Sequence, residues 1–360
     1  MAFIKQENLK YLTESKYNTS GSSWLDNKLN PFWSWFAELL PRSIAPNLIT
    51  LLGFICIILS YILMLPFGTT FEEPIPPIIL FISAFMIFMY QTFDAIDGKQ
   101  SRRINQSSPL GMLLDHGCDS LTTSFIALTL LQGMSLGLNK HTIYMYIGAQ
   151  TSFFLITWEE YHTHCCRTQF MNWGVTEAQY MSIMVLVITA IFGPGIWQAN
   201  IIGGITVAEI VLHINMGIAN LANIFVLFNV FKNSQKKRET IKSLIPVFIM
   251  DMNMVLIASK SMMANYAPII MIMHGLIFSE LCIKLIISSV SKMTFEWFQA
   301  ELVIEFIFAA AVLILDKQSV FVAVVAFLVC IVWRYSFFVW NVVYQISEYL
   351  NIPVFKVKAS

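Results

Sequence analysis

Charged residues are scarce in this 360-residue chain. They make up 12% of it, against about 25% in a soluble globular domain, while hydrophobic residues make up 57%. So little charge cannot coat a water-facing surface, which argues against a cytosolic globular protein, a disordered chain and a nucleic-acid-binding protein. The 22 Lys and Arg balance the 22 Asp and Glu, so net charge favours no acidic or basic partner. The composition indicates a polytopic membrane protein.

The chain also lacks a cysteine pattern typical of disulfide or zinc frameworks. Its six cysteines fall mostly inside apolar runs and show no such spacing, so we expect them to be packing residues. We expect no secretory signal peptide, because the segment before Pro46 is mixed polar and aromatic. The first long apolar run would then serve as its own membrane signal.

Long apolar runs predict about ten membrane-spanning helices. A helix needs about 20 apolar residues to cross a bilayer, and such runs lie near 48–68, 74–96, 112–136, 142–160, 178–197, 202–231, 243–262, 265–290, 296–315 and 319–347. The segment 24–40 mixes aromatic, aliphatic and charged residues. It is too short and too polar to span, and it predicts an interfacial amphipathic helix. The expected fold class is therefore all-α.

Basic residues predict the orientation of these spans. Lys and Arg concentrate before the first span and after the second, fourth, sixth, eighth and last ones, whereas the alternate loops are poor in them. Such residues favour the cytosolic side. The pattern fits an even number of spans with both termini in the cytosol.

Four aspartates form the most informative constellation. Asp94 and Asp97 lie three residues apart at the end of one apolar run, and Asp115 and Asp119 lie four apart at the start of the next. On helices, each pair projects from a single face. A short polar connection between antiparallel spans would bring the two faces together. Ordinary helix-capping roles are the alternative for any single Asp.

Carboxylates this close would repel one another near hydrocarbon, and a divalent metal resolves the conflict. Oxygen ligands select Mg²⁺, Mn²⁺ or Ca²⁺ over zinc, and four carboxylates supply enough oxygens for two ions. Two ions at such a site typically serve phosphate chemistry. Gly98 and Gly111 would let a bulky anion approach the backbone, and Arg102 can grip a phosphate.

Other charged residues fall inside the predicted spans. They could form pairs between helices or line the edges of a lipid groove, and the sequence does not separate these two interpretations. The five residues are Asp251, Lys260, Glu280, Glu301 and Glu305.

The acidic motif resembles a known family signature. Its spacing, Asp-x-x-Asp-Gly-x-x-(Ala)-Arg-x8-Gly-x3-Asp-x3-Asp, is similar to that of the CDP-alcohol phosphotransferases. The flanking segments resemble the eukaryotic choline and choline/ethanolamine branch; they are Ala-Pro-Asn-Leu-Ile-Thr at 45–50, Asp-Ala-Ile-Asp-Gly-Lys-Gln at 94–100, Ser-Ser-Pro-Leu-Gly at 107–111 and Asp-His-Gly-Cys-Asp-Ser at 115–120. These enzymes transfer phosphocholine or phosphoethanolamine from its CDP ester to diacylglycerol and release CMP.

The resemblance implies a role for each matching residue. Asp94, Asp97, Asp115 and Asp119 would hold two Mg²⁺ (or Mn²⁺) ions. Asn47 and Arg102 would contact CDP-choline or CDP-ethanolamine. His116 would accept the proton of the diacylglycerol hydroxyl, a role that imidazole suits near neutral pH.

The same resemblance implies a membrane setting and a division of the chain. We expect a homodimer in the endoplasmic reticulum or Golgi membrane with its active site facing the cytosol, and no nucleic-acid partner. The expected regions are a cytosolic N-terminal segment with the interfacial helix (1–46), the catalytic helices (47–231), additional membrane helices forming a dimer or lipid-site region (232–350) and a cytosolic tail (351–360).

Two departures from the family pattern leave alternatives open. Ser101 replaces the usual Ala, a small-for-small exchange. Met112 replaces a Glu that follows the second motif glycine, one turn before His116. Its absence could lower activity, shift substrate choice towards an ethanolamine-specific enzyme or mark a weakly active paralogue. A cation transporter using the acidic cluster is the rival class, although such transporters usually bind near the bilayer midplane between repeated halves.

Overall fold

The fold is a bundle of long helices. The computed structural model describes residues 3–14, 19–167, 169–170, 173–260 and 265–357. Besides α1 (Trp24–Leu39), its described residues form ten helices of 14 residues or more: α2 (Pro46–Ile62), α3 (Pro77–Arg103), α4 (Pro109–Met134), α5 (Lys140–Thr163), α6 (Val175–Phe192), α8 (Val207–Asn233), α10 (Ile245–Ala258), α11 (Ala267–Val290), α12 (Ala300–Ile314) and α13 (Lys317–Leu350).

The remaining elements are short. They are η1 (Gln6–Thr13), η2 (Leu65–Phe67), α7 (Gly195–Gln198), α9 (Lys237–Lys242), β1 (Thr19–Ser20), β2 (Cys166–Arg167), β3 (Gln169–Phe170), β4 (Trp173–Gly174), β5 (Asn200–Ile202) and β6 (Ile205–Thr206). β1 pairs in parallel with β2, whereas β3 with β4 and β5 with β6 form antiparallel pairs. The predicted all-α fold class is confirmed.

Each of the ten predicted spans corresponds to one of these ten helices. Seven helical segments in the described residues are long and apolar enough to cross a membrane, and α4, α5 and α12 are not among them. α12 has 15 residues, a length of about 22 Å at 1.5 Å per residue, shorter than a bilayer core of about 30 Å. The protein is thus an integral membrane protein by helix length and composition.

The predicted start of the sixth span is wrong. Residues 200–206 first form β5 and β6, joined by Gly203 and Gly204 with φ of 60° and 85°. These positive φ values suit glycine and reverse the chain tightly. α8 therefore begins only at Val207, after Thr206 caps it.

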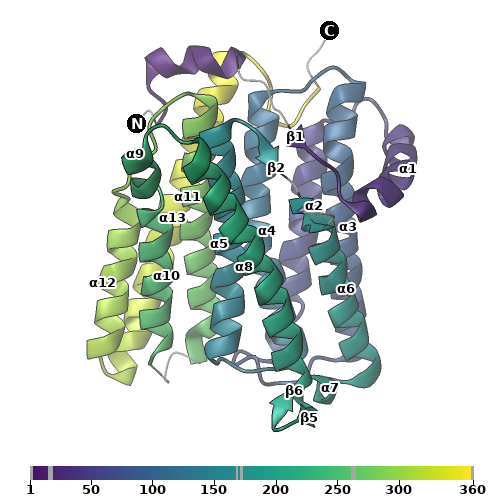
Figure 1. The fold of residues 1–360 in the computed structure, drawn as a ribbon, viewed down its shortest axis with the longest axis vertical. Coiled ribbons are helices and arrows are strands. Elements are labelled where there is room, and N and C mark those ends of the chain that lie inside the picture. The colour runs from purple at the N-terminus through teal and green to yellow at the C-terminus, as the bar shows by residue number, and fades with distance from the viewer. Residues whose placement is uncertain (1–2, 15–18, 168, 171–172, 261–264, 358–360) are drawn as a thin grey trace.

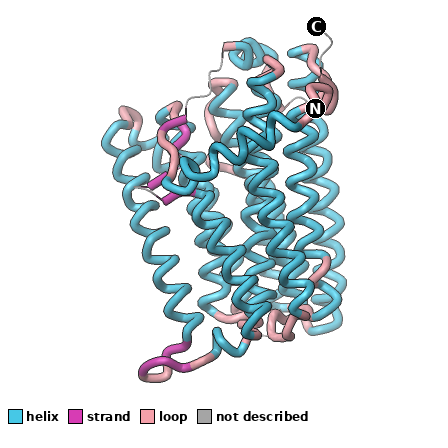
Figure 2. The backbone as a smooth tube through the Cα atoms, turned by 90° about the vertical axis from the view of Figure 1, so that its right-hand side faces the viewer, coloured by secondary structure: helices cyan, strands magenta, loops and turns pink. Residues whose placement is uncertain are grey.

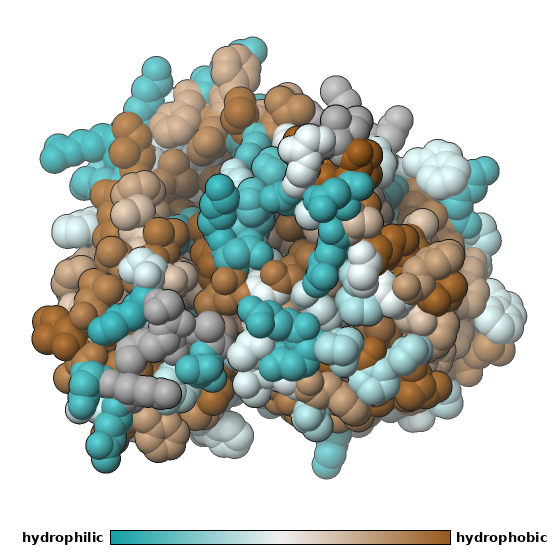
Figure 3. Space-filling model, turned by 90° about the horizontal axis from the view of Figure 1, so that it is seen from below, coloured by the Kyte–Doolittle hydropathy of each residue, from teal (hydrophilic) through white to brown (hydrophobic). Residues whose placement is uncertain are grey.

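The long helices run side by side along the longest axis of the molecule, with η1 and the end of α13 at one end and α7, β5 and β6 at the other (Figure 1). α3 and α8 finish at the same end as α13, so the basic segments 99–103 and 232–238 gather there. Figure 3 views the opposite end, where hydrophilic side chains lie over the middle with hydrophobic ones around them. The clustering of Lys and Arg at one end agrees with the predicted even number of spans.

Helix α1 lies at the basic end and crosses the long helices obliquely (Figure 2). Ser23 and Asp26 form its N-terminal capping box. The guanidinium of Arg103 closes its other end, donating to the carbonyls of Ala37 at 3.0 Å and Leu40 at 2.7 Å. The amphipathic segment predicted near 24–40 is therefore a helix anchored to the end of α3.

Two helices organise the interior. α2 packs against both α3 and α4, which touch one another only sparsely. α11 is largely buried and packs against α4, α5, α10, α12 and α13. α4 therefore lies between α2 on one side and α11 on the other.

Candidate active site

A short turn joins the two helices that carry the predicted acidic residues. α3 ends at Arg103 and α4 begins at Pro109. Asn105 has φ 55°, a left-handed conformation that helps the chain reverse. The hydroxyl of Ser108 accepts a hydrogen bond from the N–H of Gly111 at 3.1 Å and so caps α4. The acidic ends of α3 and α4 consequently lie next to each other.

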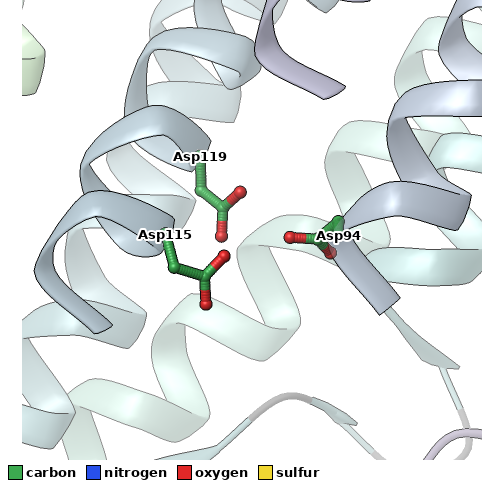
Figure 4. Close-up of side chains that lie close together, drawn as sticks. All are labelled: Asp94, Asp115 and Asp119. Carbon is green, nitrogen blue, oxygen red and sulfur yellow. The ribbon is translucent and has the colours of Figure 1, made fainter. Parts of the chain in front are cut away.

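Three aspartates face one another across these two helices. One carboxylate oxygen from each of Asp94, Asp115 and Asp119 lies within 4.8 Å of the other two. Asp94 points from α3 toward Asp115 and Asp119, which project from neighbouring turns of α4 (Figure 4). The structure thus brings together three of the four predicted aspartates.

The fourth, Asp97, lies one turn further along α3 and is buried. Its Oδ2 accepts a hydrogen bond from the hydroxyl of Thr50 on α2. It is not part of the close group of three carboxylates. Its other oxygen is still available to a shared ligand, since a carboxylate has two oxygens and several lone-pair sites.

Ion pairs among the described residues do not balance the charge of the cluster. Within the described ranges, no ion pair includes any of the four aspartates. Oδ1 of Asp115 is buried without a hydrogen-bond partner, which is costly for a carboxylate oxygen. Several carboxylate oxygens that converge around an unsatisfied position suit a hard divalent cation. The residues therefore fit a divalent metal ion.

The predicted substrate contacts surround this cluster. Asn47 lies in the first turn of α2, and its Nδ2 donates to the carbonyl of Val354 in the C-terminal segment at 2.7 Å. A Cβ on Gly111 would lie 3.3 Å from Asn47 Oδ1, and one on Gly98 would lie 3.4 Å from Arg102 Nη1. A side chain at Gly111 would therefore crowd Asn47, whereas one at Gly98 would come into contact with the Arg102 guanidinium.

His116 is half-buried on α4, between the two aspartates of that helix. One position, a turn before His116, departs from the family pattern. Met112 packs against an apolar cluster that includes Ile4, Leu110 and Leu113. A hydrophobic side chain therefore has a packing partner there, and the effect of Met112 on activity stays a prediction.

Two residues at the site were missed by sequence reasoning. The Tyr90 hydroxyl donates to Asp119 Oδ1 at 2.7 Å and accepts from the Thr122 hydroxyl at 2.8 Å. Thr50 holds Asp97 from α2. Tyr90 lies four residues before Asp94, so helical spacing could have placed it on the same face. No local signal connects Thr50 with Asp97, because they meet only through the packing of α2 on α3.

Most charged residues in the other spans are paired. Glu280 and Glu301 form ion pairs with Lys284 and Arg334 at 2.6 to 2.8 Å. The rest bond to side chains or carbonyls of neighbouring helices: Glu305 with His274 and Asn253, Asp251 with Thr151, and Lys260 with three carbonyls at the end of α12. Ion pairs between helices therefore account for Glu280 and Glu301, and hydrogen bonds to neighbouring helices account for the other three residues.

The fold and the site together define a polytopic α-helical membrane protein with an acidic centre suited to a divalent cation. Residues 43–218 match the family model of the CDP-alcohol phosphatidyltransferases. This segment, which holds every predicted site residue, is similar to the CDP-alcohol phosphatidyltransferases.

Several similar proteins carry names from one branch of this family. Cholinephosphotransferase 1 of Gallus gallus is 37% identical over 195 residues, 54% of this chain and 57% of that protein. Cholinephosphotransferase 1 of Saccharomyces cerevisiae is 38% identical over 202 residues, 55% of this chain and 51% of that protein. Choline/ethanolaminephosphotransferase 1 of Arabidopsis thaliana is 35% identical over 202 residues, 56% and 51% respectively. The chain thus matches about half the length of these relatives.

Proposed function

We propose that this protein transfers phosphocholine from CDP-choline to diacylglycerol and releases CMP. The observation that carries the proposal is the convergence of Asp94, Asp115 and Asp119 inside the family-matched segment. The names of the relatives support this class of donor. CDP-ethanolamine is proposed as a second donor, and an ethanolamine-specific or weakly active enzyme is the alternative.

We assign two Mg²⁺ or Mn²⁺ ions to the four aspartates Asp94, Asp97, Asp115 and Asp119. When bound, such ions neutralise phosphate charge and align the attacking and leaving oxygens. The two Asp of α4 face Asp94, while Thr50 and Tyr90 orient Asp97 and Asp119 through hydrogen bonds. These partners limit the rotation of the carboxylates, as supporting hydrogen bonds do in metal sites.

Asn47 and Arg102 bind the CDP-alcohol beside Gly98 and Gly111 in this proposal. Arg102 is exposed at the end of α3, where a guanidinium can grip a phosphate with two parallel hydrogen bonds. Asn47 approaches Gly111 on α4. Donor recognition therefore involves three helices: α2, α3 and α4.

His116 takes the proton from the diacylglycerol hydroxyl. The hydroxyl oxygen forms a bond to the phosphorus of phosphocholine, and the bond between that phosphorus and the bridging oxygen of CMP breaks. CMP leaves with that oxygen and its electron pair. Proton acceptance by a positioned imidazole contributes about a hundredfold or more to such reactions.

The membrane setting follows the same proposal. Basic residues gather at the end of the bundle that carries the α3–α4 turn, which supports a cytosolic active site. We also propose an endoplasmic reticulum or Golgi location and a homodimer. Diacylglycerol would then reach the site from the surrounding bilayer.

The test is an assay of purified protein with radiolabelled CDP-choline or CDP-ethanolamine, diacylglycerol and Mg²⁺ or Mn²⁺. Labelled phosphatidylcholine is the expected product. Exclusive ethanolamine transfer would favour the ethanolamine-specific alternative. Absence of transfer, together with cation flux into protein-containing vesicles, would instead support a transporter.

His116→Ala tests the assigned proton acceptor. We expect the turnover number to fall by about a hundredfold or more, with KM for CDP-choline nearly unchanged because donor binding is assigned to other residues. The measurement is steady-state kinetics at saturating diacylglycerol. Wild-type turnover in this variant would remove His116 from the mechanism and make Asp119 the better candidate.

A further inference from the structure

The face of α4 opposite its aspartates packs closely against α11. Successive helical residues are about 100° apart, so Gly117 and Ser120 point away from the side that carries Asp115 and Asp119. A Cβ on Gly117 would lie 3.4 Å from the side chain of Ile283 on α11. The contact with α11 on the opposite face therefore determines the direction in which the acidic face of α4 points.

Three hydroxyl groups form a hydrogen-bonded chain across this contact. Ser120 Oγ lies 2.7 Å from the Gly117 carbonyl oxygen and 2.7 Å from Ser279 Oγ on α11. Ser279 Oγ lies in turn 2.9 Å from the hydroxyl oxygen of Tyr335 on α13. Three hydroxyl protons suffice for three hydrogen bonds, so the chain can end at the Gly117 carbonyl with every proton used.

Both serine side chains are inaccessible to solvent. Ser120 and Ser279 are each 0% exposed, so water does not compete with these contacts. A buried hydroxyl that loses its partner costs about 1–3 kcal/mol. The chain therefore favours one rotation and one axial position of α4 relative to α11.

That rotation matters for the carboxylates. Side chains extend about 5–6 Å from a helix axis, so turning α4 by about 10° would move Asp115 and Asp119 by about 1 Å relative to Asp94. A displacement of this size is large for metal ligands, whose distances are fixed within about 0.2 Å.

We propose that Ser279 and Tyr335 are positioning residues that hold the aspartates of α4 in register with Asp94. Both lie beyond residue 218, outside the family-matched segment. The C-terminal helices would thereby determine the geometry of the metal site without contributing a ligand to it. The inference rests on the proposed function only for its kinetic effect, because metal binding can be measured separately.

The test compares Ser279→Ala and Tyr335→Phe with two matched controls. Ser288→Ala removes another buried α11 hydroxyl, one that bonds only within its own helix to the Lys284 carbonyl at 2.8 Å. Tyr344→Phe removes an exposed hydroxyl from α13. The full-length proteins in lipid nanodiscs are titrated with Mn²⁺, and free Mn²⁺ is followed by electron paramagnetic resonance.

We expect the Mn²⁺ Kd to rise about tenfold in Ser279→Ala, and by a smaller factor in Tyr335→Phe, with both controls at the wild-type value. The double variant should bind no more weakly than Ser279→Ala, because the two residues act in series. The same order is expected for the Mn²⁺ concentration that gives half-maximal transferase activity.

Wild-type Mn²⁺ affinity in both variants would overturn the proposal. A lower thermal stability with unchanged Mn²⁺ affinity would mean that the hydroxyl groups contribute only to helix packing. Tyr335→Phe keeps the test decisive if Ser279→Ala does not fold, because Tyr335 is only partly buried and lies at the end of the hydroxyl chain. Weakened Mn²⁺ binding in a protein that transfers no CDP-alcohol would uphold the positioning role and refute the proposed function.

Discussion

Two groups of charged side chains lie among the helices, and they are balanced differently. Between α11, α12 and α13, the carboxylates of Glu280 and Glu301 each contact both Lys284 and Arg334. Between α3 and α4, one carboxylate oxygen from each of Asp94, Asp115 and Asp119 lies within 4.8 Å of the other two. Tyr90 donates a hydrogen bond to Asp119, and Thr50 donates one to Asp97, one turn further along α3. The first group has two charges of each sign, and the second has only negative charge.

This difference indicates what each group does. The glutamate group, which consists of Glu280, Glu301, Lys284 and Arg334, is neutral as a whole. Its four ion pairs connect three helices, so it stabilises their packing. The aspartate cluster keeps a buried oxygen of Asp115 without a partner. Unpaired charge inside a membrane protein usually marks a functional site, because it is expensive to maintain. A bound divalent cation, as proposed above, would supply the missing positive charge.

The largest effect that separates the two groups is expected from Asp115→Asn. Removal of one anionic ligand should lower turnover by about a thousandfold, equivalent to about 4 kcal/mol. The metal-free variant should melt at or above the wild-type temperature, since repulsion within the cluster falls. Transferase kinetics and thermal unfolding in EDTA check both parts.

Asp97→Asn should behave in the same way if both proposed ions depend on a shared ligand set. Near-normal turnover in both variants would rule out the metal assignment. Loss of turnover only in Asp115→Asn would reduce the site to the three aspartates that lie close together.

Glu301→Gln should give the opposite result. It leaves Lys284 and Arg334 with one carboxylate between them, and breaking a buried pair in this way costs about 3–5 kcal/mol of stability. The actual loss should be smaller than this, because the two cationic side chains are 21% and 27% exposed and solvent screens their charges. Turnover per folded molecule should stay within about twofold of wild type.

Thermal unfolding measures the stability of Glu301→Gln, and kinetics normalised to the concentration of active sites measure its turnover. Asp115→Asn is measured in the same way for comparison. A large loss of turnover without a loss of stability would show that the glutamate group is functional, and the comparison would fail.

A smaller effect is expected from Tyr90→Phe. It removes the hydrogen bond to Asp119 at 2.7 Å and keeps the ring. Hydrogen bonds to charged groups are worth about 1.5–3 kcal/mol, and supporting partners of metal ligands change metal affinity by about tenfold or more. The Mg²⁺ concentration for half-maximal activity should therefore rise about tenfold. Tyr349→Phe, which changes an exposed side chain of α13, is the control and should leave it unchanged. An unchanged Mg²⁺ dependence would mean that the carboxylate needs no such support.

The fold and the acidic centre could be predicted from the sequence because each leaves a local signal. Apolar runs locate the ten long helices, and spacings of three and four residues place Asp94, Asp97, Asp115 and Asp119 on helix faces. The start of α8 was misplaced because apolar residues in β5 and β6 extend the run. Gly203-Gly204 was the available signal for that turn.

Contacts between distant segments could not be predicted. Thr50 meets Asp97, and Ser279 meets Ser120, only because α2 and α11 pack on either side of the site. Neither pair follows from periodicity within one helix. The same holds for the four-residue glutamate group, since Glu280, Glu301 and Arg334 come from three helices and their pairing depends on packing.

Thermal unfolding with and without divalent metal tests the central comparison most directly. A ligand at about a hundred times its Kd stabilises the folded state by about 2.7 kcal/mol. We therefore expect saturating Mn²⁺ to raise the Tm of the wild type and of Glu301→Gln by several degrees, and to leave the Tm of Asp115→Asn unchanged. An equal rise in all three proteins, or none in the wild type, would contradict the assignment of the aspartate cluster as a metal site.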